Sequence, residues 1–286
     1  LTAVVNIEGN FVIDAGAEGI WVLQSTMVAI KDNIVKSSDG AGIRVRASPE
    51  AMVSGNHVLN SGSNGISVTA SARTEISGNT IANCGTSTVR TQPLYVASAN
   101  AIIKDNVIYD DRSYTNRGHL AVEVRDSDNI VSGNEICFST SYGLYIYGHR
   151  STIIRNYIHD NAYDGIRIPY DKDNNTITSN IIRNNRQYGI TIQTFCDGTH
   201  VTGNTFDGNT LGAINDLGAG TVIRNNSRSS PVSEIKDSFG TSIGLGTSST
   251  CPTSDTIYAV GKADICIVTD VPSKLTITIN SVEQQH

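Results

Sequence analysis

The sequence has little charge and no long apolar run, and both absences narrow the class of protein. Only 17% of its 286 residues are charged, and the formal net charge of −6 comes without a basic stripe. We therefore expect no nucleic-acid partner, because binding to a phosphate backbone needs clustered Lys and Arg. No apolar run approaches the roughly 20 residues that cross a bilayer, so we expect no membrane-spanning segment either.

The sequence also lacks a sustained apolar stripe with a helical period, the pattern typical of an amphipathic helix. Apolar and polar residues instead alternate in short runs that are bounded by Gly, Asn, Asp and Ser. Such runs are typical of short, half-buried strands. The sequence therefore predicts an all-β fold in which helix is scarce.

The short runs recur as a repeat that is marked by asparagine. Each marker follows an aliphatic residue by three positions, and the set is Asn10, Asn33, Asn56, Asn79, Asn106, Asn134, Asn156, Asn180, Asn204 and Asn225. Successive markers are 21 to 28 residues apart, a period typical of solenoids whose units stack on their neighbours. We interpret these asparagines as structural, because Asn tolerates left-handed backbone at a bend and its amide can bond to the next coil.

A second marker recurs in step with the first, a small residue followed by two apolar residues that flank a polar one. It occurs at Gly19, Gly42, Gly65, Gly143, Gly165 and Gly189. Over residues 1–227, the two markers together resemble the right-handed parallel β-helix repeat of the pectate-lyase-like superfamily. The resemblance implies a solenoid of about ten coils. It also implies relatives among pectate and alginate lyases, C5-epimerases, polygalacturonase-type hydrolases and phage tailspikes.

Residues 228–286 leave the repeat. A Ser/Gly/Thr-rich stretch follows the last marker, and residues 256–260 and 274–279 then alternate like strands. We predict a C-terminal linker and a β cap that shields the last coil, with a small separate β domain as the alternative. A disulfide between Cys251 and Cys266 stays open, whereas Cys84, Cys137 and Cys196 are interpreted as fillers of the core or of loops.

The sequence starts with Leu1 and enters the repeat almost at once, so we expect no signal peptide within it. We interpret the chain as a mature or trimmed protein, or as part of a larger one. Frequent Gly and polar outward positions agree with a secreted or cell-surface protein, periplasmic or extracellular. We expect a monomer rather than a trimer.

The repeat places residues that are far apart in sequence on one face. The outward position after each small residue gives one column, and the next outward position gives a second that includes Arg125 and Tyr147. The members of the first column are Trp21, Arg44, Ser67, Tyr95, Glu123, Tyr145, Arg167 and Thr191. The middle of this face concentrates Tyr and Arg, and the loops at residues 89–93 and 110–119 lengthen the two coils beside it. We predict the functional site there.

This set of residues suits the removal of a proton next to a carboxylate. Arg pairs with a carboxylate in a bidentate way, while Tyr or His can serve as base and acid, Tyr most readily where adjacent cations lower its pKa. We assign catalysis to Tyr145, Tyr147, His149, Arg125 and Arg167. Substrate binding is assigned to Tyr95, Glu123, Arg44, Arg46, Tyr170, Lys172, His119 and Arg117.

The set is similar to the Tyr/His/Arg sites of β-helical alginate lyases and C5-epimerases. The resemblance implies action on an acidic, uronate-containing polysaccharide by β-elimination or C5 epimerisation. The epimerase string Tyr-Gly-Phe-Asp-Pro-His-Asp is absent, and the segment Tyr147-Gly148-His149-Arg150 matches only its start.

Two other functions stay open. A glycoside hydrolase would need paired carboxylates, which Glu123, Asp164 and Asp171 could supply. A glycan-binding or tailspike-like β-helix would need only the Tyr and Arg face.

The predicted chemistry requires no cofactor. Calcium is an optional ligand, because Asp171, Asp173 and Asn175 offer oxygen atoms at alternate positions as a calcium loop does. His57, His159 and His200 occupy scattered turn positions, and we assign no metal site to them.

Overall fold

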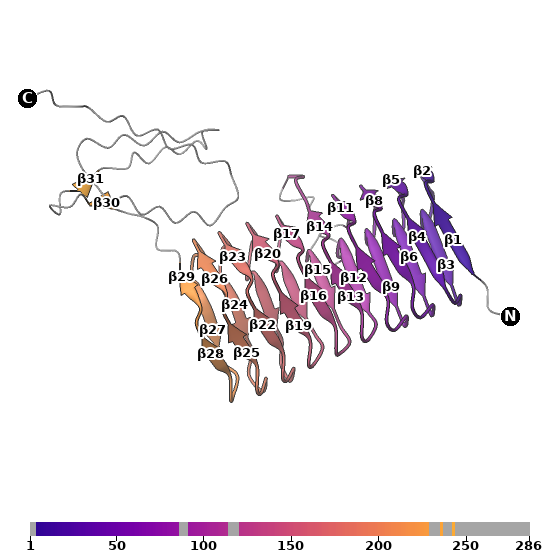
Figure 1. The fold of residues 1–286 in the computed structure, drawn as a ribbon. Helices are drawn as coiled ribbons and strands as arrows, with labels where there is room; N and C mark the ends of the chain where they lie inside the picture. The colour runs from indigo at the N-terminus through magenta and orange to yellow at the C-terminus, as the bar shows by residue number, and fades with distance from the viewer. Residues whose placement is uncertain (1–3, 86–90, 114–119, 229–234, 237–241, 244–286) are drawn as a thin grey trace, which may run out of the picture. The chain divides into compact units, whose positions relative to one another are not determined.

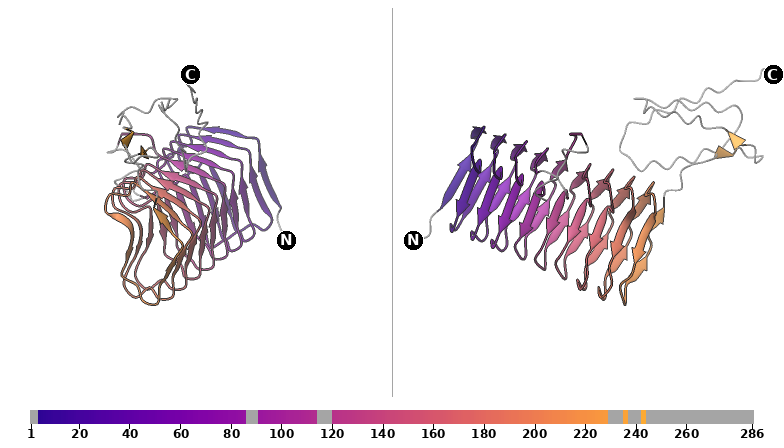
Figure 2. Two further views of the ribbon diagram at one scale, coloured as in Figure 1. Left: turned by 60° about the vertical axis from the view of Figure 1, so that its left-hand side comes forward. Right: turned by 180° about the vertical axis from the view of Figure 1, so that it is seen from behind.

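The computed structural model describes residues 4–85, 91–113, 120–228, 235–236 and 242–243. These residues form strands, bends and turns, and no helix occurs among them. Three strands make one coil, and each strand pairs in parallel with the strand three places away in sequence order. The predicted all-β parallel solenoid is confirmed, and Figures 1 and 2 show its strands stacked coil upon coil.

Two of the three parallel sheets contain ten strands each. Sheet A consists of β1 (Val5–Glu8), β4 (Val28–Lys31), β7 (Met52–Ser54), β10 (Glu75–Ser77), β13 (Ile102–Lys104), β16 (Ile130–Ser132), β19 (Thr152–Ile154), β22 (Thr176–Thr178), β25 (His200–Thr202) and β28 (Val222–Arg224). Sheet B consists of β2 (Phe11–Ile13), β5 (Ile34–Lys36), β8 (His57–Leu59), β11 (Thr80–Ala82), β14 (Val107–Tyr109), β17 (Glu135–Cys137), β20 (Tyr157–His159), β23 (Ile181–Arg183), β26 (Thr205–Asp207) and β29 (Ser227–Arg228).

The third sheet contains nine strands and carries the face that was predicted to hold the site. Sheet C consists of β3 (Ile20–Leu23), β6 (Ile43–Arg46), β9 (Ile66–Thr69), β12 (Leu94–Ala97), β15 (Val122–Val124), β18 (Leu144–Ile146), β21 (Ile166–Ile168), β24 (Tyr188–Ile192) and β27 (Gly212–Asp216). About ten coils were predicted, and the strand counts of the three sheets agree with that number.

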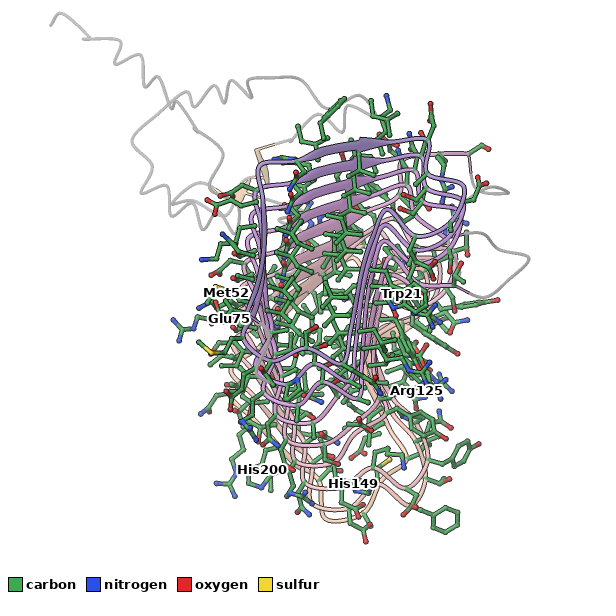
Figure 3. All side chains as sticks on the ribbon, turned by 90° about the vertical axis from the view of Figure 1, so that its right-hand side faces the viewer. Trp21, Met52, Glu75, Arg125, His149 and His200 are labelled. Carbon is green, nitrogen blue, oxygen red and sulfur yellow. The ribbon has the colours of Figure 1, made fainter. Side chains whose placement is uncertain are left out.

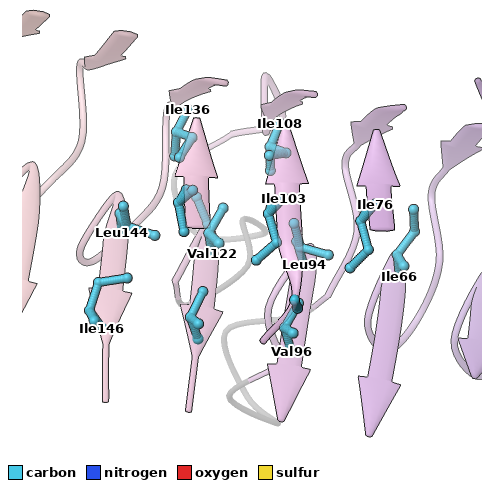
Figure 4. Close-up of a cluster of buried hydrophobic side chains, with 14 of the residues drawn as sticks. Ile66, Ile76, Leu94, Val96, Ile103, Ile108, Val122, Ile136, Leu144 and Ile146 are labelled. Carbon is cyan, nitrogen blue, oxygen red and sulfur yellow. The ribbon is translucent and has the colours of Figure 1, made fainter. Parts of the chain in front are cut away.

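The core is a stack of aliphatic side chains, because alternate residues of every strand point inward. Figure 4 shows part of it, where side chains from all three sheets meet. Fully buried members include Ile66, Ile76, Leu94, Ile103 and Ile108. Burial of one such side chain is worth about 1.5–3 kcal/mol, so the alternation that predicts the strands also supplies most of the stabilisation.

The asparagine ladder runs unbroken along the bend between sheets A and B. From Asn10 to Asn204, each side-chain amide donates to the side-chain oxygen of the next coil's asparagine at 2.9–3.0 Å. The last acceptor is Asn226, so the prediction of Asn225 as the final member is wrong. The amides also donate to strand carbonyls, as Asn33 does to Ile7. This satisfies backbone groups that the bend would leave buried and unpaired.

The left-handed backbone lies one residue before each ladder asparagine. Asp32 and Asp105 have φ of 52° and 55°, and Asn225 itself has φ of 52°. The expectation that the ladder asparagines themselves adopt this conformation is therefore wrong. Asn225 fits the repeat as the left-handed residue before Asn226, which explains why the sequence pattern selected the wrong member of the pair.

The glycines of the second marker are required by close packing. A Cβ on Gly143 would lie 2.8 Å from both the carbonyl oxygen of Gly165 and a methyl carbon of Ile158. A Cβ on Gly42 would lie 2.2 Å from Val58 and 2.8 Å from the carbonyl oxygen of Gly65. The marker glycine thus occurs at the start of its sheet C strand, where the backbone packs closely on side chains of sheet B.

Residues 1–228 and 229–286 form two separate units. In the second unit, the structure describes only an antiparallel pair, β30 (Ile235–Lys236) and β31 (Ser242–Ile243). The predicted cap strands at 256–260 and 274–279, and both Cys251 and Cys266, lie outside the described residues. The C-terminal cap stays a prediction.

Candidate functional site

The structure stacks the predicted outward column on sheet C. Successive strands place these residues as direct neighbours, in the order Trp21, Arg44, Ser67, Tyr95, Glu123, Tyr145, Arg167 and Thr191. Pro93 and Ala121 replace the marker glycine in two coils without disturbing this register. Figure 3 shows Trp21 and Arg125 on one side of the solenoid, with Met52 and Glu75 of sheet A on the opposite side.

Arg125 lies at the centre of this face and is held on three sides. Its Nε donates to Glu123 Oε1 at 2.7 Å, and Glu123 is only 4% exposed. The guanidinium carbon lies 5.7 Å from the ring centroids of both Tyr95 and Tyr147. The Arg125 side chain remains half exposed, and within the described part of the chain only its Nε has a hydrogen-bond acceptor. The geometry leaves both terminal nitrogens able to bind an incoming anion.

A ribbon of four tyrosines crosses sheet C beside Arg125. Ring centroids lie 5.5 Å apart from Tyr163 to Tyr142, 5.6 Å from Tyr142 to Tyr145, and 6.1 Å from Tyr145 to Tyr147. Lys172 Nζ lies 4.7 Å from the Tyr147 centroid, so Tyr147 has a cation contact from each of two directions. Aromatic faces flanked by cations suit the apolar faces and anionic groups of an acidic sugar.

Arg167 is bound within the protein rather than presented to solvent. Its Nη1 donates to Asp164 Oδ2 at 2.9 Å, and its guanidinium carbon lies 4.8 Å from the Tyr142 centroid. Asp164 is fully buried and also accepts from the backbone N–H of Tyr188. The sequence reasoning assigned Arg167 to substrate. Its contacts make it a support for Asp164 and the tyrosine ribbon.

Tyr145 keeps its proton more firmly than a free phenol. Burial raises the pKa of Tyr145, and this effect outweighs the opposing influence of Arg167. Burial raises the pKa of Tyr142 in the same way. The expectation that adjacent cations lower the pKa of a site tyrosine does not hold for Tyr145, whose raised pKa keeps its hydroxyl protonated at neutral pH and unsuited to act as a base.

His149 lies at the bend between sheets C and A, below Arg125 in the view of Figure 3. Its Nδ1 accepts the backbone N–H of Asp173 at 3.1 Å and lies 3.6 Å from Asp173 Oδ2. With Nδ1 engaged as an acceptor, the neutral ring carries its proton on Nε2. Nε2 of the neutral His149 ring is therefore a donor, and the predicted role of His149 as a base would require breaking the bond from Asp173.

The other predicted binding residues fall into separate places. Arg44 pairs with Glu18 at 2.6 Å and lies over Trp21 at 5.5 Å, several coils from Arg125, with Arg46 exposed beside it. Tyr170 is 58% exposed at the bend after β21. Arg117 and His119 lie outside the described residues.

Two of the three candidate calcium ligands, Asp173 and Asn175, already have partners. Asn175 is fully buried, and its side-chain oxygen accepts the N–H of Ser151. Asp173 Oδ1 accepts the N–H of Asp197, while Asp171 lies exposed at a left-handed position. Calcium binding by these residues stays a prediction.

The ion pair between Asp164 and Arg167 is expected to stabilise this face. Asp164→Asn keeps the side-chain size but removes the charge, so it should lower the free energy of unfolding by about 2–3 kcal/mol, as for a lost hydrogen bond between charged groups. Urea denaturation measures the change, with the exposed Asp171→Asn as the matched control. Equal stability of the two variants would show that Arg167 does not depend on Asp164.

Sequence reasoning did not find the support provided by Tyr142, and it considered Asp164 only as a hydrolase carboxylate. Both precede a sheet C strand by a few residues, in the bend where side chains no longer alternate. The only hint of the ion pair in the sequence is the spacing of three residues between Asp164 and Arg167. This spacing brings the two side chains together only for the particular backbone path of that bend, which the sequence does not reveal.

Comparisons with known proteins agree with this architecture. The family model described as right handed beta helix region matches residues 2–115 and 109–228. A search of the curated proteins finds no significant match. None of the described residues forms a helix long and apolar enough to cross a membrane.

Three solved structures illustrate the similarity. A double mutant of the periplasmic alginate epimerase AlgG is 16% identical with a TM-score of 0.56, and the match covers 71% of this chain and 51% of that one. A tailspike double mutant of E. coli bacteriophage HK620, in complex with pentasaccharide, is 13% identical with a TM-score of 0.55, covering 65% and 39%. The GH87 alpha-1,3-glucanase of Streptomyces thermodiastaticus strain HF3-3 is 13% identical with a TM-score of 0.62, covering 79% and 48%. This chain thus spans about half or less of each of these proteins, and the likeness is one of fold.

Proposed function

We propose that this chain, which belongs to the right-handed β-helix family, acts on an acidic, uronate-containing polysaccharide through the face of sheet C. The observation that supports this best is Arg125, whose guanidinium is fixed by Glu123 and two tyrosine rings while its terminal nitrogens have no hydrogen-bond acceptor among the described residues. A fixed, half-exposed guanidinium is suited to bind a carboxylate in a bidentate way.

The proposed reaction is removal of the C5 proton, followed by β-elimination or by reprotonation on the opposite face. Arg125 neutralises the substrate carboxylate, which makes the C5 proton more acidic. Tyr147, acting as a phenolate, is the residue we assign to accept that proton, because it is exposed and lies beside Arg125 and Lys172. The negative charge then develops on the substrate, where these two cations stabilise it. Tyr145, whose hydroxyl stays protonated, is the residue we assign to donate a proton to the leaving oxygen or to the opposite face.

The pairing of the candidate carboxylates disfavours one of the two alternatives. A hydrolase would need two available carboxylates, yet Glu123 is bound to Arg125 and Asp164 to Arg167. A non-catalytic glycan-binding surface fits the tyrosine ribbon equally well, since aromatic faces pack on sugars without any reaction. The test therefore has to separate binding from chemistry.

The test is incubation of the full chain with alginate blocks, pectate and glycosaminoglycans. Ultraviolet absorption follows unsaturated uronate, and proton NMR follows inversion at C5. We expect one of these signals with at least one polymer. Intact polymer in every case, with binding retained, would contradict the enzymatic proposal and favour a binding surface.

The remaining parts of the proposal follow from the same substrate. A polymer of this kind is met outside the cytoplasm, so we propose a periplasmic, secreted or cell-surface location. Proton removal by Tyr147 needs no cofactor, and calcium bound by Asp171 and Asp173 would be an optional addition. The solenoid is proposed to act as a monomer, since Arg125 and the tyrosine ribbon belong to one chain.

A further inference from the structure

A second cluster of reactive side chains lies on sheet B, away from the polysaccharide face. Glu135 and Cys137 belong to β17, and His159 occupies the neighbouring position to Cys137 in β20. One ligand atom from each of the three lies within 4.8 Å of the other two. No other group of three His, Cys, Asp or Glu side chains in the described ranges comes together in this way.

The imidazole of His159 is fixed in one orientation. Its Nδ1 lies 2.6 Å from Asp160 Oδ2, and the ring stacks on Tyr157 at 4.1 Å. Phe138 meets the ring edge-on at 5.9 Å. A carboxylate on one imidazole nitrogen is the usual partner of a histidine that binds a metal through the other nitrogen.

The second nitrogen of His159 faces negative charge. Its Nε2 lies 3.3 Å from Glu135 Oε1, and the sulfur of Cys137 converges on the same place. With Nδ1–H donated to Asp160, the Nε2 lone pair points at a carboxylate, and a cation is needed between them. A proton on Nε2 would bridge only the imidazole and Glu135, whereas a metal ion would also bind the sulfur of Cys137.

We propose that Glu135, Cys137 and His159 bind a Zn²⁺ ion, with Asp160 as a positioning residue. A set of one sulfur, one nitrogen and one oxygen ligand suits zinc, and a fourth position remains for water. Around a tetrahedral zinc ion, with bonds of about 2.0–2.3 Å, ligand atoms lie roughly 3.3–3.8 Å apart. The 3.3 Å separation of Nε2 and Oε1 already matches this spacing.

Access and charge agree with an ion rather than a larger ligand. Cys137 is 3% exposed and His159 8%, which excludes a polymer, while the Glu135 side chain is 44% exposed and opens the cluster to solvent. Arg183 lies in the coil beyond His159, whereas both acidic ligands lie in the coil before it. Glu135 and the Cys137 thiolate would balance the two charges of the ion.

The full chain in metal-free buffer tests the proposal by titration with Co²⁺, a spectroscopic substitute for zinc. We expect a saturable visible spectrum with a thiolate-to-cobalt charge-transfer band, one ion per chain, and displacement by Zn²⁺. Cys137→Ser should abolish the charge-transfer band, while Cys84→Ser, which alters another buried cysteine, should retain it. Asp160→Asn should keep the band and weaken binding about 10- to 100-fold.

A further variant distinguishes the loss of a metal ligand from a loss of folding. Glu135→Gln changes a partly exposed side chain, so it should leave the circular dichroism spectrum unchanged while it weakens cobalt binding by about 10-fold or more. The absence of a saturable cobalt spectrum would overturn the proposal. A charge-transfer band that persists in Cys137→Ser would overturn it too, because the metal would then be bound by a different thiol.

Discussion

Tyr147→Phe is expected to lower turnover of an acidic polysaccharide by about 10²- to 10⁴-fold, the usual contribution of a general base. The substitution removes only the hydroxyl group. The ring contacts with Tyr145, Arg125 and Lys172 remain, so the melting temperature should stay unchanged. Initial rates on the polymer that gives the strongest product signal, compared with the unmodified chain, measure the effect.

Tyr109→Phe is the matched control, because Tyr109 lies in β14 on sheet B. Its activity should equal that of the unmodified chain. Full activity of Tyr147→Phe would remove Tyr147 from the mechanism. An equal loss in both variants would show that the effect is not specific to the sheet C face.

Asn134→Ala is expected to be strongly destabilising. The Asn134 oxygen accepts from both the backbone N–H and the amide of Asn106, and its own amide donates to Ile103, Ser132 and Asn156. All of these groups lie in or beside the core, so several would be left unsatisfied at about 1–3 kcal/mol each. We expect the free energy of unfolding to fall by about 3 kcal/mol or more.

Chemical denaturation measures this loss, and Asn6→Ala is the control. Asn6 is exposed in β1, and its side-chain amide donates only to Glu8. Its replacement should change stability by less than about 0.5 kcal/mol. If Asn134→Ala were as stable as Asn6→Ala, the ladder would be a consequence of the fold rather than a support for it.

The fold follows from the sequence because alternation and period act together. Alternation assigns inward and outward positions, and the period stacks them, so even Tyr95 and Glu123 were placed correctly without their marker glycine. The same logic chose Asn225 over Asn226, since two adjacent asparagines satisfy a one-dimensional pattern equally. Only the backbone shows that Asn225 takes the left-handed conformation and Asn226 donates to the core.

The site was less predictable because the role of each cation depends on which carboxylate it contacts. Sequence reasoning placed Arg125 and Arg167 as equivalent cations. The structure distinguishes them, since Asp164 engages Arg167 from within a bend while Glu123 leaves Arg125 half exposed. The raised pKa of Tyr145 likewise depends on how its neighbours exclude water, which no spacing reveals.

The sheet B cluster was missed although its signal was present. Cys137 and His159 are separated by 22 residues, the same interval as Asn134 and Asn156. Residues one coil period apart in sequence are neighbours in adjacent coils. A search for reactive residues at this interval would therefore have paired Cys137 with His159. Short-range motif spacing, which is the usual way to recognise a metal site, does not apply to a solenoid.

The most direct test of the proposed reaction is incubation of the chain with uronate polymers in D₂O. Removal of the C5 proton predicts either deuterium at C5 of the recovered polymer or unsaturated uronate at new chain ends, and both should depend on Tyr147. A polymer that binds but keeps all its C5 hydrogens and its length would contradict the account. New ends without unsaturation would contradict it as well, because they would show hydrolysis.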